Sequence, residues 1–348
     1  CHLCGKVFTA NRPANIGQRK YDATAASMIA LLKYGTGLPF NRLAGLQRTL
    51  RIPLPASTQW DVIEAFASSV TPAYEELLRQ AAAGEVLHNE DTTAKILEML
   101  GKRRKKACQS NVATRTGIFT SGVVAVREGC KVALFFSGRQ HAGENLSDVL
   151  KHRSEALTRP IQMCDALSRN LSAELKTIVA NCLAHARRKF VEIYDRFPDE
   201  CRYVVTAFKV VYRNEAIAIK GKLSSQERLQ FHQQKSQVVM DELHNWLGCQ
   251  LNEKRVEPNS ALGDAITYML NHWDKLTLFL RQAGAPLDNN LCERALKKAI
   301  LHRKNALFFK TQNGARVGDL YMSVIHTCEL SGVCLLYTSD AADDSKRV

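Results

Sequence analysis

Residues 115–126 (RTGIFTSGVVAV) and 130–137 (CKVALFFS) are short segments rich in β-branched and aromatic side chains. Such segments are typical of strands. Two more, 85–93 (EVLHNEDTT) and 160–166 (PIQMCDA), are interpreted in the same way, and 143–153 (GENLSDVLKHR) between them is expected to be a helix. These segments predict a sheet with a helix between its strands.

The chain then changes its order of elements. Residues 172–197 (SAELKTIVANCLAHARRKFVEIYDRF) are predicted to pass from a helix through a short apolar strand into another helix. Strands therefore come first and afterwards alternate with helices, which indicates an α/β fold.

Helical segments lie on both sides of this part. Residues 21–82 are predicted to be helices separated by short turns, with Ser57 or Thr58 as the N-cap of the third helix. Helix, turn, helix is compatible with a helix-turn-helix DNA-binding region and equally with an ordinary α-hairpin. Residues 199–283 are also predicted to be helical and to interrupt the α/β part.

The composition favours a polyanionic partner. The 348 residues carry a formal net charge of +14, spread along the chain, and nucleic acid is the simplest partner for such a surplus. Apolar residues make up 45%, as in a globular protein, and no apolar run is long enough to cross a membrane. The eleven cysteines are an odd number and mostly scattered, which favours reduced thiols and a cytoplasmic location over a disulfide framework.

The two ends are unusual. Cys1 and Cys4 have the spacing of half a zinc knuckle, so 1–20 is interpreted as the remnant of a zinc-binding segment. The segment 334–344 (CLLYTSDAADD) resembles a translated sequencing adapter, and 334–348 is therefore excluded as an artefact tail. The natural protein is expected to extend beyond both ends.

Acidic residues mark three places in the predicted α/β part. Glu90 and Asp91 end the first strand, Asp165 follows an apolar run, and Glu293 follows LDNN. A carboxylate directly after an apolar run is unusual unless it is paired or binds a metal. Hydrolysis and transfer of phosphodiesters use two divalent ions about 3.5–4 Å apart, and carboxylates are the protein ligands that Mg²⁺ prefers.

Basic residues follow two of these places. Arg187, Arg188 and Lys189 come after the C-x-x-H pair Cys182 and His185, as a phosphate clamp or as a solvated helix face. After Asp288, a candidate helix cap, and Glu293 come further basic residues: Arg294, Lys297, Lys298, Arg303 and Lys304. These cannot all share one helix face, so only some can follow DNA.

Taken together, these blocks resemble the insertion-sequence-66-type transposases, a DDE family of bacterial mobile elements. The blocks that carry the resemblance are KYDATAASMIALLKYGTGLPFNRL (20–43), LHNEDTT (87–93), CLAHARRKF (182–190), SALGDAITYMLNHWDKLTLFL (260–280), LDNNLCERALKKAILHRKNALFF (287–309) and LYMSVIHTCELSG (320–332). They cover roughly 1–333 in order, and the run DNN-x-x-ER followed by RKN is the most specific.

The resemblance implies an RNase H-like catalytic domain over 84–333, with a mixed sheet flanked by helices and a helical insertion, about 199–283, before the last acid. It implies two Mg²⁺ or Mn²⁺ ions, with Asp165 as the second catalytic acid and Glu293 as the third. The implied activity is DNA cleavage and strand transfer on terminal inverted repeats and target DNA. The implied enzyme is a homo-oligomer at the bacterial nucleoid, with room for accessory proteins encoded by the element.

The first acid departs from the family pattern. Alignment with the family pattern places the catalytic Asp on Glu90. Alternatively, Asp91 is the first acid, because Asp91-Thr92-Thr93 also fits an Asp-x-Thr pattern. Adjacent residues of a strand point to opposite faces, so only one of them is expected at the metals. The departure leaves open a second function, a catalytically impaired, DNA-binding transposase remnant. A stand-alone RNase H-like nuclease is disfavoured by the basic N-terminal helices.

Overall fold

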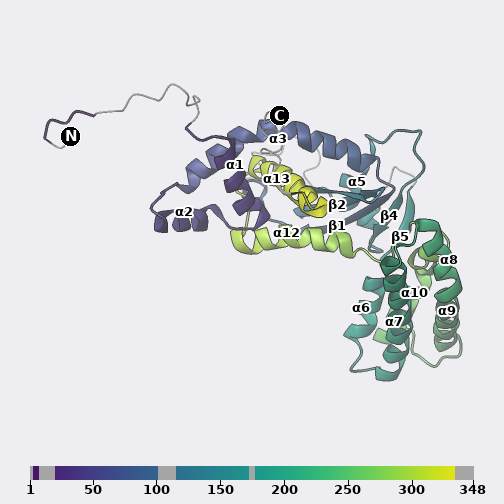
Figure 1. Ribbon diagram of the computed structural model, residues 1–348. Coiled ribbons are helices and arrows are strands. Elements are labelled where there is room, and N and C mark those ends of the chain that lie inside the picture. The colour runs from purple at the N-terminus through teal and green to yellow at the C-terminus, as the bar shows by residue number, and fades with distance from the viewer. Residues whose placement is uncertain (1–2, 8–19, 101–114, 172–176, 334–348) are drawn as a thin grey trace.

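The computed structural model describes residues 3–7, 20–100, 115–171 and 177–333 (Figure 1). At its centre lies a five-stranded sheet in the order β3-β2-β1-β4-β5. Its strands are β1 (Val86–Thr93), β2 (Phe119–Arg127), β3 (Cys130–Gly138), β4 (Ile161–Cys164) and β5 (Ile178–Asn181). The first three are antiparallel neighbours, and β4 and β5 run parallel to β1. This mixed sheet confirms the predicted RNase H-like α/β fold.

The turn between β2 and β3 fixes their register. Arg127 pairs with Cys130, so only two residues form the turn. Both have positive φ angles, 50° at Glu128 and 82° at Gly129. A turn with two positive φ angles matches the twist of the flanking strands, and glycine adopts such an angle at little cost.

Helices cover both faces of the sheet. On one face Val124, Ala133 and Phe135 pack against helices α1 (Ala23–Ala30), α3 (Ala56–Ala82), α12 (Asn290–Ala306) and α13 (Gln312–Ser331). On the other face Val123 and Leu134 pack against α5 (Ala142–Leu150) and the end of α3. Because both faces are covered, the central residues of β2 and β3, 123–126 and 132–136, are continuously apolar rather than alternating.

The N-terminal helices match the prediction in number, but not at one boundary. A π-helical turn at Leu31–Gly35 follows α1, and α2 (Phe40–Thr49) precedes α3. The N-cap of α3 is Pro55, without a side-chain hydrogen bond, so the predicted cap at Ser57 or Thr58 is wrong. Both residues lie in the first turn because the helix already begins at Ala56. Since α3 continues along α13 and the sheet, it is longer than the segment that suggested a helix-turn-helix.

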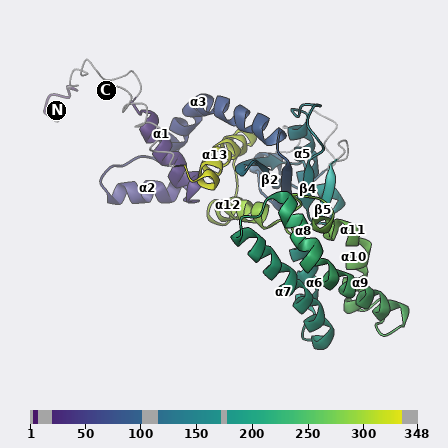
Figure 2. The same cartoon turned by 45° about the vertical axis from the view of Figure 1, so that its right-hand side comes forward.

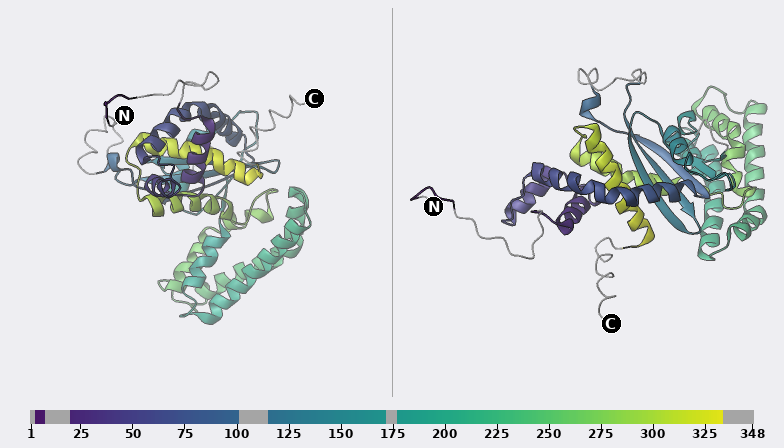
Figure 3. Two further views of the ribbon diagram at one scale, coloured as in Figure 1. Left: turned by 60° about the vertical axis from the view of Figure 1, so that its left-hand side comes forward. Right: turned by 90° about the horizontal axis from the view of Figure 1, so that it is seen from above.

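The insertion is a helical layer beyond β5 (Figure 2). It follows α6 (Leu183–Glu192) and contains α7 (Pro198–Lys220), α8 (Ser225–Lys235), α9 (Gln237–Asn252), α10 (Ala261–Asn271) and α11 (Trp273–Leu276). One continuous apolar core joins Phe208 and Leu243 of these helices to Met163 and Ala180 of the sheet. The insertion and the N-terminal helices lie at opposite ends of the molecule (Figure 3).

Some predictions fall on other parts of the chain. Cys1, most of the 1–20 segment and the tail 334–348 lie outside the described residues. Cys4 is described, and it is exposed. Within the described ranges, no helix is both long and apolar enough to cross a bilayer.

Candidate active site

Four elements bring the predicted acids toward one end of the sheet. β4 pairs with β1 only as far as His88 and Met163, so Asp165, directly after β4, comes level with Glu90 in the middle of the longer strand β1. Helix α12 packs across β1 and β2, and its first turn carries Glu293. Helix α6 begins immediately after β5 and supplies Cys182 and His185.

The surroundings of Glu90 connect three of the acids. Burial, followed by the carboxylates of Asp165 and, more weakly, Glu293 and Asp91, raises the pKa of Glu90 to about 7. A hydrogen bond of 3.0 Å from Asn289 Nδ2 to Glu90 Oε2 opposes this rise in pKa. Glu90 therefore shares its electrostatic environment with the acids predicted as the second and third members of the site.

Asp91 lies among other partners. Its Oδ2 is 2.9 Å from Nδ1 of His141, the residue that begins α5. Its Oδ1 is 3.6 Å from Nη2 of Arg169, in the 3-10 helix Ser168–Asn170. The side chain of Asp91 is only 2% exposed. His141 and Arg169 hold Asp91 in its own polar cluster.

Asp165 is buried and firmly held. Its Oδ1 accepts hydrogen bonds from the Leu167 amide, at 3.1 Å, and from Asn170 Nδ2. Its carbonyl accepts a bond of 3.4 Å from Asn181 Nδ2. Among the described residues no donor to Oδ2 is present. One carboxylate oxygen of Asp165 is thus fixed by the protein.

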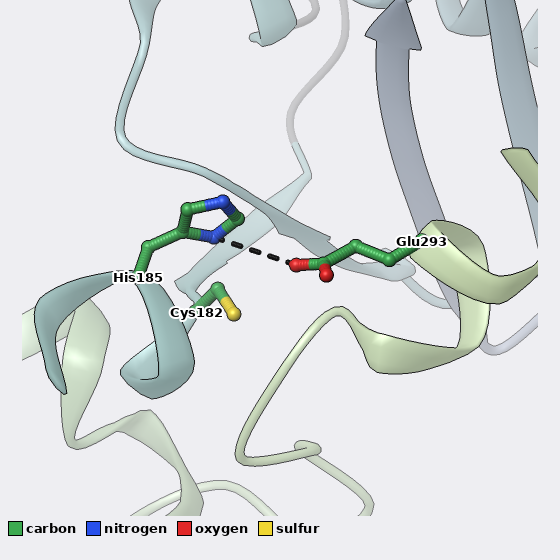
Figure 4. Close-up of side chains that lie close together, drawn as sticks. All are labelled: Cys182, His185 and Glu293. Carbon is green, nitrogen blue, oxygen red and sulfur yellow. Dashed lines mark ion pairs between the residues drawn. The ribbon is translucent and has the colours of Figure 1, made fainter. Parts of the chain in front are cut away.

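Glu293 faces the start of α6, as Figure 4 shows. Its Oε1 is 3.8 Å from Nδ1 of His185, and the two side chains point toward one another. Donor atoms of Cys182, His185 and Glu293 all lie within 4.8 Å of one another. Burial raises the pKa of the Cys182 thiol to about 12, although the backbone amides of Asn289 and His185 oppose this.

Asn289 is a central residue that the sequence did not reveal. Its fully buried side chain donates to Glu90 and to the Asn89 carbonyl, and its Oδ1 lies 3.1 Å from Nδ1 of His88. Its backbone amide donates to Cys182 Sγ at 3.2 Å. The asparagine pair in LDNN belongs to the run DNN-x-x-ER, the most specific part of the resemblance, but that run assigns Asn289 no partner. Its contacts span about 200 positions, and no local pattern reports them.

The start of α12 also differs slightly from the prediction. The N-cap position belongs to Asn289, not to Asp288. Asp288 lies one residue earlier, and its Oδ1 accepts the amide of Asn290 at 3.1 Å. Asp288 is therefore not the N-cap residue, although its carboxylate accepts the first helical amide; the Asn289 side chain makes no capping bond.

The basic residues of α12 fall into two groups. Lys298 Nζ lies 3.0 Å from Glu329 Oε1, and Arg303 donates to Thr92 and Thr93. Arg294, Lys297 and Lys304 are exposed. Their spacing of three and seven residues places them on one helix face. Only this second group presents a continuous basic surface.

On α6 all three predicted basic residues, Arg187, Arg188 and Lys189, are exposed. Being consecutive, they point in different directions around the helix. Lys189 Nζ lies 4.4 Å from the centre of the Tyr268 ring, over its face. Arg187 and Arg188 remain available to a ligand at the start of the insertion.

A mixed sheet of this order, with carboxylates on β1, directly after β4 and in the first turn of α12, is consistent with an RNase H-like protein. The pattern of the transposase IS66 family matches residues 19–317, and the chain belongs to that family.

Curated relatives extend the match along the chain. Uncharacterized protein y4hP of Sinorhizobium fredii (strain NBRC 101917 / NGR234) is 27% identical over 96% of this chain and 61% of its own length. Uncharacterized protein y4jD of the same strain is 28% identical over 96% of this chain and 64% of its own length. The chain thus spans less than two thirds of these relatives.

Proposed function

We propose that this chain belongs to an active transposase and that Glu90, Asp165 and Glu293 are its metal-binding carboxylates. The observation that carries the proposal is the pKa of Glu90, raised by burial and then by Asp165 and Glu293. Carboxylates that repel one another in a partly buried site are stabilised by divalent cations. Membership of the transposase IS66 family supports the same activity.

Glu90, Asp165 and Glu293 offer the carboxylate oxygens that Mg²⁺ or Mn²⁺ prefers, although among the described residues only Cys182, His185 and Glu293 have donor atoms within 4.8 Å of one another. Asp165 is held through Oδ1, and Asn289 orients the carboxylate of Glu90. When bound, such ions activate the attacking oxygen and stabilise the leaving oxygen. Asp91, held by His141 and Arg169, supports the site from the opposite face of β1 instead of binding metal.

Two transfers complete the proposed reaction. Water attacks a phosphodiester at the end of the element, which releases a 3′-hydroxyl and leaves a 5′-phosphate on the other fragment. That 3′-hydroxyl then attacks a phosphodiester of the target, joins to its phosphorus and displaces the target strand's own 3′-oxygen. Exposed Arg187, Arg188 and the basic face of α12 hold the DNA backbone.

The proposed setting follows from this reaction. Both terminal inverted repeats must be joined to one target, so a homo-oligomer with one active site for each end suits the task. Accessory proteins of the element complete the machinery. The proposed reaction takes place in the bacterial cytoplasm, at the nucleoid.

The test is cleavage of DNA that carries the ends of the element, by the full-length protein with Mg²⁺ or Mn²⁺. Asp165→Asn and Glu293→Gln should each lower the rate at least a hundredfold, because each removes a charged metal ligand. Asp91→Asn should fold less stably but keep measurable cleavage. If Glu90→Gln keeps full activity and Asp91→Asn is inactive, the first metal-binding carboxylate is Asp91 and not Glu90.

The glutamate at position 90 supports a second candidate, a DNA-binding remnant with impaired catalysis. A longer side chain displaces a metal by about an ångström, enough to lower activity strongly. Glu90→Asp separates the two functions. If the unaltered protein binds the element's ends but cleaves only after this substitution, the remnant is the correct description.

A further inference from the structure

The cluster of Cys182, His185 and Glu293 is chemically different from the proposed magnesium cage. Sulfur and imidazole nitrogen are poor ligands for Mg²⁺, which prefers oxygen. A thiolate, an imidazole and a carboxylate together are the donor set of zinc sites. The proposed DNA chemistry has no use for a thiol, so these residues call for a separate explanation.

From this juxtaposition we propose that Cys182, His185 and Glu293 form a Zn²⁺ site, and that bound zinc withdraws Glu293 from the magnesium cage. The first part stands on the cluster alone. The second part rests on the proposed function, since it assumes that Glu293 is a catalytic carboxylate. Zinc would thus inhibit the enzyme by occupying Glu293, the third acidic residue.

The geometry suits a tetrahedral ion. Zinc bonds of 2.0–2.3 Å place neighbouring ligand atoms roughly 3.5 Å apart. His185 Nδ1 and Glu293 Oε1 are already 3.8 Å apart, and all three donors lie within 4.8 Å (Figure 4). Binding therefore requires the sulfur to approach by about an ångström or less. Three protein ligands leave a fourth position for water.

The facing atoms also lack other partners. His185 Nδ1 and Glu293 Oε1 are buried, and neither has a hydrogen-bond partner among the described residues. Buried polar atoms are nearly always bonded, so such a pair indicates a missing ligand. The side chains themselves remain 21% and 27% exposed, which gives an ion from solvent a path to the site.

The backbone holds the site in position. Cys182 precedes α6 and His185 lies three residues later, so the helix brings both side chains to one side. The Asn289 amide donates to Cys182 Sγ at 3.2 Å. Hydrogen bonds of this kind orient metal ligands and stabilise a thiolate. The same residue fixes the chain four positions before Glu293.

The binding test uses Co²⁺ as a spectroscopic substitute for zinc, without DNA. Cys1→Ser and Cys4→Ser are introduced first, so that the N-terminal cysteines do not contribute. The expected result is a thiolate-to-cobalt charge-transfer band and the visible absorption of a tetrahedral ion, both reversed by zinc. Cys201→Ser, at another fully buried cysteine, is the matched control and should keep the bands.

Cys182→Ser should abolish the charge-transfer band, and His185→Gln should weaken cobalt binding at least tenfold. His185 is partly exposed, so this second variant remains informative if the first fails to fold. Circular dichroism of each variant checks the fold. Absence of the bands in the parent protein, or their persistence in folded His185→Gln, would overturn the zinc site.

Inhibition is then measured as the ratio of DNA cleavage with and without micromolar zinc, at fixed Mg²⁺. Zinc should lower the cleavage rate at least tenfold in the parent and in Cys201→Ser. In His185→Gln it should lower the rate much less. Cobalt bands with a zinc-independent ratio would overturn the inhibitory part alone. Loss of cleavage under all conditions, with intact cobalt bands, would count against the proposed function and leave the zinc site standing.

Discussion

The carboxyl group of Glu90 should make the metal-free protein less stable at high pH. Its pKa is about 7 in the folded chain, against 4.5 for an ordinary glutamate. The folded state therefore binds more protons between these values, and stability is lost as the pH rises through about 7. Glu90→Gln removes this loss.

We expect Glu90→Gln to be more stable than the parent by about 3 kcal/mol at pH 8, and nearly equal to it at pH 4. Urea denaturation in the presence of a chelator measures both values. Buried Asp319, whose pKa burial also raises to about 7, is common to both proteins and cancels in the comparison. Equal stabilities at pH 8 would show that Glu90 ionises without difficulty.

Asn289 should be one of the most sensitive polar positions in the chain. Asn289→Ala leaves His88 and Glu90 without their hydrogen-bond partner, so a loss of about 2–4 kcal/mol is expected. The free energy of unfolding measures this loss. Asn290→Ala is the matched control, because Asn290 is exposed and bonds only to nearby Asp288. Similar losses in both variants would contradict a central role for Asn289.

Which single residues matter was only partly visible in the sequence. The four acids stood out because each follows a strand or begins a helix. The separation of Glu90 from Asp91 was predicted from strand geometry, but the partners of Asp91 were not. His141 is 50 positions away from it and Asn289 is 199 positions from Glu90, and such pairings arise only when the chain folds.

Among the elements, α12 offers the clearest test of DNA contact. Replacing Arg294, Lys297 and Lys304 with Ala should weaken DNA binding. It should also make the affinity less dependent on salt concentration. Each lost phosphate contact lowers the slope by about 0.9. Lys298→Ala is the control, because its ammonium is paired with Glu329 inside the protein. Binding titrations over a range of salt concentrations give both slopes, and an unchanged slope in the triple variant would remove this face from the interface.

The elements themselves were largely predictable. Composition identified all five strands, since each contains a short run of apolar residues that the covered sheet buries. Helix boundaries were less accessible. The first turn of α3 was misjudged because serine and threonine are common caps, whereas Pro55, with its fixed φ, occupies the position here.

For the whole molecule, Mg²⁺ should stabilise the fold in a pH-dependent manner. A ligand that binds only the folded state raises stability according to its affinity. Glu90 must lose its proton to bind a cation, so the increase in melting temperature with Mg²⁺ should be larger at pH 8 than at pH 6. Thermal unfolding at both values measures it. The difference between the two pH values should vanish in Glu90→Gln, and its persistence there would assign the proton to another group.

The insertion begins and ends at the same place. Leu183 N donates to Leu287 O at 3.0 Å, beside the bond between Asn289 N and Cys182 Sγ. The two chain segments that lead into and out of the helices α7 to α11 are therefore hydrogen-bonded to each other, although they lie about a hundred positions apart in the sequence. These two segments are called the stem. A load on those helices, such as bent DNA, would therefore pull on both sides of the stem at once. Because the same helices share one apolar core with Met163 and Ala180 of the sheet, such a load would reach β4 and β5 as well as the segments that carry Cys182 and Glu293.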